Sequence, residues 1–67
     1  GAMSEELTDR ELAVLRALPG RASRRDIGAA LNLSINTVKA YTASLYRKLG
    51  VGSREDAVAA GRRLGLI

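Results

Sequence analysis

The sequence contains no cysteine, histidine, tryptophan or phenylalanine, and it has one proline and two tyrosines among 67 residues. Without cysteine there is neither a disulfide nor a thiolate nucleophile. Without histidine the chain lacks the commonest metal ligand and the usual acid or base near neutral pH. We therefore expect no metal site, no cofactor and no catalytic residues, and the composition argues against an enzyme.

Long apolar runs are also absent. No run approaches the roughly 20 residues of a membrane span, and no signal-peptide pattern is present. We therefore expect a cytoplasmic protein without a membrane partner. The length of 67 residues corresponds to one small domain, near the lower size limit for a single aliphatic core.

The net charge of +4 is unevenly distributed along the chain. Residues 1–20 hold two arginines against four carboxylates, whereas residues 21–48 hold six basic side chains against one aspartate. Residues 49–67 hold three arginines against two carboxylates. A cationic middle segment suits a polyanion, nucleic acid first and an anionic membrane second. A solvated basic face is an equally good interpretation of the charge alone.

Helix start and stop signals recur along the chain. Four hydroxyl residues are placed to cap helices, namely Thr8, Ser23, Ser34 and Ser53. Four turn signals follow them, at Pro19-Gly20, Asn32, Gly50 and Gly65. Strand alternation and hairpin dipeptides do not occur. The sequence predicts an all-α four-helix bundle with helices at about 9–18, 24–31, 35–49 and 54–64. Residues 1–3 are typical of a tag remnant, and we expect residues 4–67 to form the domain.

The second and third predicted helices are joined only by Asn32-Leu33-Ser34. So short a connection between a short and a longer helix is typical of a helix-turn-helix, whose second helix enters the major groove. With the apolar stripe of helix 35–49 turned inward, we expect its other side to face outward, namely Asn36, Lys39, Ala40, Ala43, Ser44 and Arg47. Small side chains let a helix enter the groove, and a lysine can reach guanine. The predicted base-facing residues are Asn36, Lys39, Ala40 and Ala43.

Phosphate contacts are expected from two places. Ser23, Arg24 and Arg25 open the second helix, where free N–H groups and the helix dipole favour an anion. Thr37 and Arg47 are placed to hold phosphates along the third helix. Plainer interpretations stand beside these: Ser23 caps a helix in any case, and Lys39 on an exposed face is more often a solvated charge.

Four sequence blocks cover the chain from Leu7 to Leu66. They are residues 7–15, residues 27–34 with Asn36-Thr37-Val38-Lys39, the run Tyr46-Arg47-Lys48-Leu49-Gly50-Val51, and residues 53–58 with Leu64-Gly65-Leu66. Together they resemble the LuxR-type (GerE- or FixJ-type) DNA-binding domain of bacterial transcriptional regulators. The resemblance is greatest to the C-terminal domains of large regulators, and a response-regulator output domain is the other parent we consider.

The resemblance implies a four-helix domain that regulates transcription by binding duplex DNA as a homodimer, with the third helix as the recognition helix. Lys39, Ala40 and Ala43 fall where the family places base-facing residues. The fourth helix commonly makes the dimer contact, and the positions that fall there are Val58, Gly61 and Arg62.

Two positions depart from the family pattern. Tyr41 stands where many members have histidine, and Ala43 stands where many have a polar or basic side chain. One side chain that could hydrogen-bond to a base is therefore missing at position 43. We expect DNA binding to depend more on phosphate contacts, on Lys39 and on DNA shape.

Two other function classes remain as alternatives. An RNA-binding module would need aromatic stacking platforms, and only Tyr41 and Tyr46 are available. A small helical protein-interaction or dimerisation module would use the small-residue face of the last helix, around Ala57, Ala60 and Gly61. A domain of this size leaves little apolar surface for an interface, so a monomer in solution is compatible with a dimer on DNA.

Overall fold

The computed structural model describes residues 6–67, so the expected tag remnant at residues 1–3 lies outside the described part. The described residues form four α-helices and no strand: α1 (Asp9–Ala17), α2 (Arg24–Leu31), α3 (Ile35–Leu49) and α4 (Arg54–Arg63). The all-α prediction is confirmed, and α2 and α3 have the predicted bounds.

The other two helices each end one residue earlier than predicted. The N–H of Leu18 donates to the carbonyl of Leu15 at 3.1 Å, so the last turn of α1 tightens ahead of Pro19, which has no N–H to continue the helix. At the end of α4, Gly65 adopts a left-handed conformation with φ 76°. Leu64 is therefore the C-cap of α4 rather than a helical residue.

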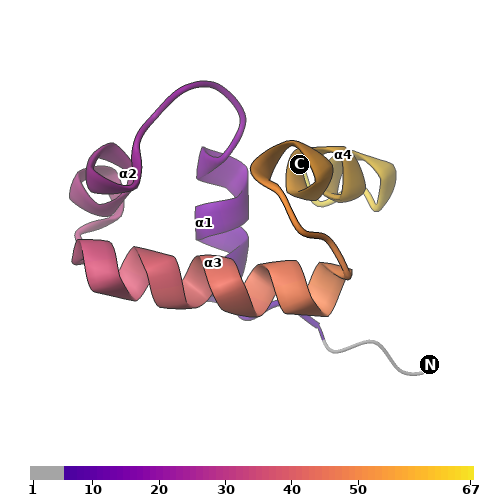
Figure 1. Cartoon of the computed structure of the whole chain (residues 1–67), viewed down its shortest axis with the longest axis horizontal. Helices are drawn as coiled ribbons and strands as arrows, with labels where there is room; N and C mark the ends of the chain where they lie inside the picture. Colours follow the sequence, from indigo (N-terminus) through magenta and orange to yellow (C-terminus); the bar gives the residue numbers. More distant parts are fainter. Residues whose placement is uncertain (1–5) are drawn as a thin grey trace.

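The four helices are arranged around α3, the longest of them. Figure 1 shows α3 along the base of the molecule, with α2 and α4 above its two ends and α1 behind its middle. All three other helices pack on α3, and α1 also contacts α2 and α4. One long helix is therefore held from one side, and its other side is left open along its length.

Each helix begins at the hydroxyl residue that the sequence predicts. The side chains of Thr8 and Ser23 accept hydrogen bonds from the N–H groups of Glu11 and Asp26, and both carboxylates bond back to the cap N–H. These are complete capping boxes. Ser34 and Ser53 cap α3 and α4 with one such bond each, at 3.1 Å. Because a cap involves residues only three positions apart, it is readable from sequence.

The core is aliphatic and lies between α3 and the other helices. Its buried members are Val14, Leu15, Leu18, Ile27, Val38, Leu45 and Ala57. Thr42 joins them at 6% exposure. Its hydroxyl donates to the carbonyl of Val38 at 2.7 Å, which satisfies the buried polar group.

Candidate nucleic-acid interface

The turn between α2 and α3 has the compact geometry that a helix-turn-helix needs. Asn32 ends α2 in a left-handed conformation with φ 61°, which asparagine tolerates better than most residues. The N–H of Leu33 then donates to the carbonyl of Gly28 at 2.7 Å. The chain therefore reverses within three residues and α3 starts at Ser34.

Gly28 allows this turn to close tightly. A Cβ atom at this position would lie 2.5 Å from the carbonyl oxygen of Leu33, far inside van der Waals contact. From sequence, a glycine inside α2 only costs helix stability relative to alanine. In the folded protein that cost is offset, because the missing side chain lets α2 and the start of α3 approach.

The open side of α3 contains all four predicted base-facing residues. All four are exposed, namely Asn36, Lys39, Ala40 and Ala43. Arg47 is exposed as well. α3 contains no acidic residue, so no carboxylate on it would repel a phosphate backbone. The leading surface of the helix is thus small and cationic, as an element that enters the major groove has to be.

Ser44 does not lie on this open side, and its predicted outward position is wrong. It is half-buried, and its hydroxyl donates to a carboxylate oxygen of Glu11. The reason is that α1 crosses α3 at this point, so position 44 faces α1. Thr37 is also half-buried; its hydroxyl accepts a hydrogen bond from the Ser34 hydroxyl at 2.9 Å, which ties it to the cap of α3.

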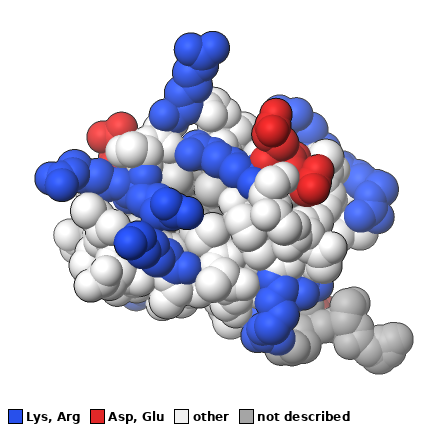
Figure 2. Space-filling view, viewed as in Figure 1, with Lys and Arg blue, Asp and Glu red and all other residues white. Residues whose placement is uncertain are grey.

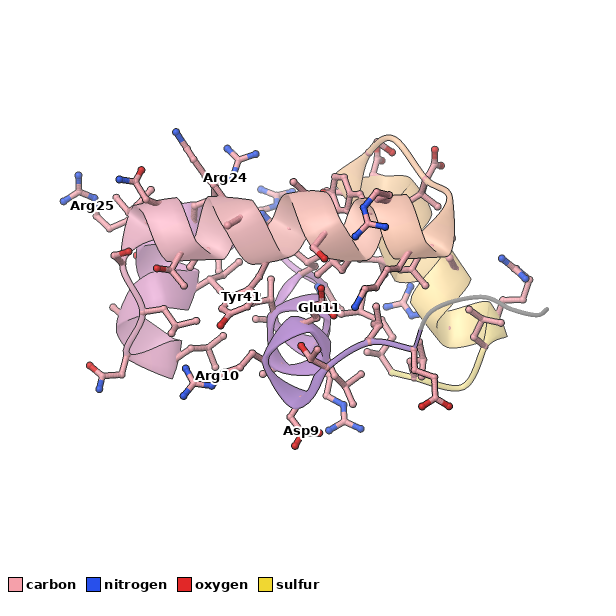
Figure 3. All side chains as sticks on the ribbon, turned by 90° about the horizontal axis from the view of Figure 1, so that it is seen from below. Asp9, Arg10, Glu11, Arg24, Arg25 and Tyr41 are labelled. Carbon is pink, nitrogen blue, oxygen red and sulfur yellow. The ribbon has the colours of Figure 1, made fainter. Side chains whose placement is uncertain are left out.

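The residues that begin α2 are all exposed. In Figure 3, Arg24 and Arg25 project beside the N-terminal half of α3, on one edge of that helix. Tyr41 leaves α3 on the opposite edge and packs against the core. Ser23 serves as the cap of α2 and is exposed at the same time. The structure therefore brings the predicted phosphate residues of α2 next to the start of α3, and it separates Tyr41 from them.

A surface hollow of about 570 Å³ lies between the start of α2, the middle of α3 and the start of α4; we name it the α2–α3 hollow. Four cationic side chains and no carboxylate contribute to its lining, namely Arg24, Arg25, Lys39 and Arg54. Ser23 and Tyr46 also line it. Sequence reasoning did not place Arg54 or Tyr46 at this surface, because the elements that carry them meet the hollow only through the tertiary fold.

Basic and acidic side chains are unevenly distributed over the molecular surface. In Figure 2, basic side chains lie over α2 and the nearer part of α3 and also around α4, whereas most of the visible acidic side chains lie toward α4. Five of the six basic residues in the middle segment are exposed, and the sixth, Lys48, pairs with Glu11.

Among the titratable groups of residues 6–67, Glu11 is the one whose pKa is strongly shifted. It is 3% exposed, and burial by itself would raise its pKa. Hydrogen bonds from Lys48, Ser44 and the backbone of Thr8 outweigh burial and lower the pKa of Glu11 from 4.5 to about 2. The carboxylate is thereby held ionised by its partners, in the manner of a structural ion pair.

α4 exposes only part of the surface that the sequence pointed to. Arg62 is exposed and Val58 half-buried, but Gly61 is buried. A Cβ at Gly61 would lie 3.2 Å from Ile67 and 3.3 Å from Leu15, so this glycine faces the core of its own chain. The outward stripe of α4 contains Val58 and Arg62 together with Glu55 and Ala59.

Within residues 6–67, no helix has the length and apolar character that crossing a membrane requires. The same part of the chain holds no cluster of three or more acidic, cysteine or histidine side chains suited to a metal ion.

Comparison with known proteins places these features in a family. The family described as "Bacterial regulatory proteins, luxR family" matches residues 5–60. The chain is 36% identical over 62 residues to the transcriptional regulatory protein YdfI of Bacillus subtilis, covering 92% of this chain and 29% of that protein. It is 48% identical over 48 residues to the nitrate/nitrite response regulator protein NarP of Escherichia coli, and the match covers 72% of this chain and 22% of that protein.

A third relative is much longer. The HTH-type transcriptional regulator MalT of Yersinia enterocolitica is 40% identical over 58 residues, which cover 87% of this chain and 6% of that protein. The chain therefore spans less than a third of each of these three relatives.

Proposed function

This chain belongs to the luxR family of bacterial regulatory proteins, and from that premise we propose how its helix-turn-helix domain contributes to DNA-binding transcription regulation. α3 enters the major groove of duplex DNA, the start of α2 rests on the phosphate backbone, and α4 contacts a second copy. The domain acts in the bacterial cytoplasm as the DNA-binding part of a longer regulator.

The observation that carries this proposal is the open side of α3. Its exposed positions are one lysine, one arginine, one asparagine and two alanines, with no carboxylate, and Arg24 and Arg25 stand beside it. Lys39 and Asn36 read base edges, and the methyl groups of Ala40 and Ala43 contact thymine methyls. Ser23, Arg24, Arg25, Thr37 and Arg47 hold the backbone and set the register.

The burial of the two tyrosines favours duplex DNA over RNA as the partner. Tyr41 and Tyr46 are both half-buried, so neither presents an open ring on which a base could stack. The long open side of α3 suits a wide groove rather than single-stranded loops.

The direct test is an amide-shift titration of the labelled domain with a mixed-sequence duplex of about 20 base pairs at low salt. We expect shifts at residues 23–26 and along the open side of α3. With about four or five phosphates neutralised, log K should fall with log[salt] at a slope near −4. Shifts confined to α4, or tighter binding of single-stranded RNA at equal salt, would contradict the proposal.

The proposed dimer contact uses the outward stripe of α4. Sedimentation of the domain with a duplex that carries two half-sites about one helical turn apart should detect two copies per duplex. Arg62→Glu should weaken binding of the second copy. Arg63→Glu is the matched control, because it makes the same charge change at the neighbouring exposed position. Equal behaviour of the two variants would exclude α4 as the contact.

A further inference from the structure

The edge of α3 opposite Arg24 and Arg25 carries a polar group and a cation to which the proposed function gives no role. In Figure 3 the Tyr41 side chain leaves α3 on this edge, and Arg10 projects from the first turn of α1 on the same edge. That turn lies against α3, because Glu11 accepts a hydrogen bond from Ser44. We name Arg10 and Tyr41 together the α1 edge of α3.

The ring and the hydroxyl of Tyr41 have different surroundings. The residue is half-buried, and its ring packs against the aliphatic core. Its hydroxyl makes no hydrogen bond to another described residue. Among the described residues, Nη2 of Arg54 is the single buried side-chain nitrogen or oxygen without a partner, so the Tyr41 hydroxyl reaches solvent. A ring held by the core therefore presents a donor to an acceptor outside the protein.

Arg10 is exposed, and its side chain makes no ion pair or hydrogen bond with another described residue. The residues on either side of it are carboxylates. Glu11 is buried and its charge is paired with Lys48, and Asp9 points away from α3 in Figure 3. The Arg10 guanidinium is therefore able to meet an anion at the edge of α3.

We propose that Arg10 and the Tyr41 hydroxyl hold a phosphate of the second DNA strand, on the wall of the major groove opposite the one that Arg24 and Arg25 contact. The inference rests on the proposed placement of α3 in the groove. It goes beyond that placement, because the contacts proposed for α2 all lie at the other edge of α3. Each edge of the recognition helix is thereby assigned to a different strand.

The dimensions of the helix and of the groove favour this arrangement. With its side chains an α-helix is about 10–12 Å across, and the major groove of B-DNA is about 12 Å wide. A helix that fills the groove therefore brings each of its edges to a sugar-phosphate wall, and the two walls belong to different strands. A guanidinium pairs well with phosphate oxygens, and a tyrosine hydroxyl also donates to them.

The two residues should give different signatures when they are replaced. Arg10→Gln removes one phosphate-neutralising charge, so the salt slope should become smaller by about 1, and at about 0.1 M salt binding should weaken about five- to tenfold. Tyr41→Phe removes a neutral donor and keeps the ring in the core, so binding should weaken about threefold with the slope unchanged. Arg63→Gln is the matched control, because it loses the same charge at an exposed position on α4.

Single neutral methylphosphonate linkages identify the strand that each residue contacts. The duplex is selected for binding and shortened to one half-site of about one helical turn, so that one copy binds in one orientation. Each strand is scanned separately with the wild-type domain and the variants. The losses caused by Arg10→Gln and Tyr41→Phe should disappear at the same one or two linkages of one strand. The loss caused by Arg24→Gln should disappear only at linkages of the other strand.

A second measurement uses the wild-type domain and does not depend on the folding of a variant. The Nε–H resonance of Arg10 should shift on binding the charged duplex and stay near its free position when the critical linkage is neutral. The Nε–H resonance of Arg63 should not move with either duplex.

Three results would overturn the assignment of Arg10 to the second strand. They are equal binding by Arg10→Gln and Arg63→Gln, a loss that persists at every linkage, and a loss that disappears on the strand that Arg24 contacts. In each of them the wild-type domain still binds the duplex, so the proposed function stands. Failure of the wild-type domain to bind any duplex would instead refute the proposed function.

Discussion

The ammonium group of Lys48 donates to Oε1 of Glu11 at 2.7 Å, although the two residues are 37 positions apart. Both side chains are almost fully buried, with 10% and 4% exposure. Glu11 also closes the capping box of α1, so one carboxylate joins the beginning of α1 to the last turn of α3. The pair therefore sets how α1 crosses the helix that we place in the major groove.

Replacing one partner of this pair should destabilise the domain strongly. Glu11→Gln leaves the Lys48 charge buried without its counter-ion, and we expect the free energy of unfolding to fall by about 3 kcal/mol. Lys48→Met should have a comparable effect. The double variant should lose less than the two single losses together, because it leaves no unpaired buried charge. Urea denaturation of the four proteins measures the coupling, and strict additivity would show that the pair contributes nothing as a pair.

Acid should weaken the same contact. In the folded domain the pKa of Glu11 is about 2, below its ordinary value of 4.5, so the unfolded chain binds a proton more readily than the folded protein. The stability from Glu11 is therefore fully present above about pH 4.5 and is lost as pH falls toward 2. Urea midpoints measured between pH 7 and pH 2 should decline over this window. Glu11→Gln, which cannot titrate, should show a flatter decline, and parallel curves would contradict the assignment.

For Gly28, the structure predicts a change in stability on substitution by alanine that is opposite to the one helix propensity predicts. Alanine is the better helix former by about 0.5–1 kcal/mol, yet its Cβ at this position would lie 2.5 Å from the Leu33 carbonyl oxygen. We expect Gly28→Ala to lower stability by about 1–3 kcal/mol. Gly52→Ala is the matched control, because a Cβ there meets no atom within 4 Å; it should change stability by less than about 0.5 kcal/mol. A stabilised Gly28→Ala protein would mean that the turn relaxes freely.

The features that sequence predicted well are local ones. Helix caps join residues three positions apart, and the exposed side of α3 follows from its apolar period, so Ser34 and Lys39 could be placed without a structure. Even the short turn at Asn32 is readable, since its length alone favours the helix-turn-helix.

Long-range contacts account for what the sequence did not give. Ser44 was expected outside because its own helix offers no reason to turn it inward; the reason is Glu11 on α1. No local pattern marks Arg54, because its partners, the carbonyl groups of Leu18 and Ala22, are more than 30 positions away. Gly61 was expected at an interface on family grounds, and it is covered by Ile67 and Leu15 of its own chain. In each case the deciding partner lies on another element.

Lys39 and Arg24 should differ in what their loss does to DNA recognition. Lys39 is exposed on α3 and Arg24 is exposed at the start of α2. In the proposed placement, Lys39 meets base edges and Arg24 meets phosphates. Lys39→Ala should therefore weaken a selected duplex more than a scrambled one, by about 1–3 kcal/mol of discrimination for a good base contact. Arg24→Ala should weaken binding to both duplexes by a similar factor and reduce the salt slope by about 1.

Fluorescence anisotropy with both duplexes at several salt concentrations measures these changes, with Arg63→Ala as the control for loss of one positive charge. If Lys39→Ala lost affinity equally on both duplexes, Lys39 would be a phosphate contact, and sequence reading would have to come from Asn36, the two alanines or the shape of the DNA.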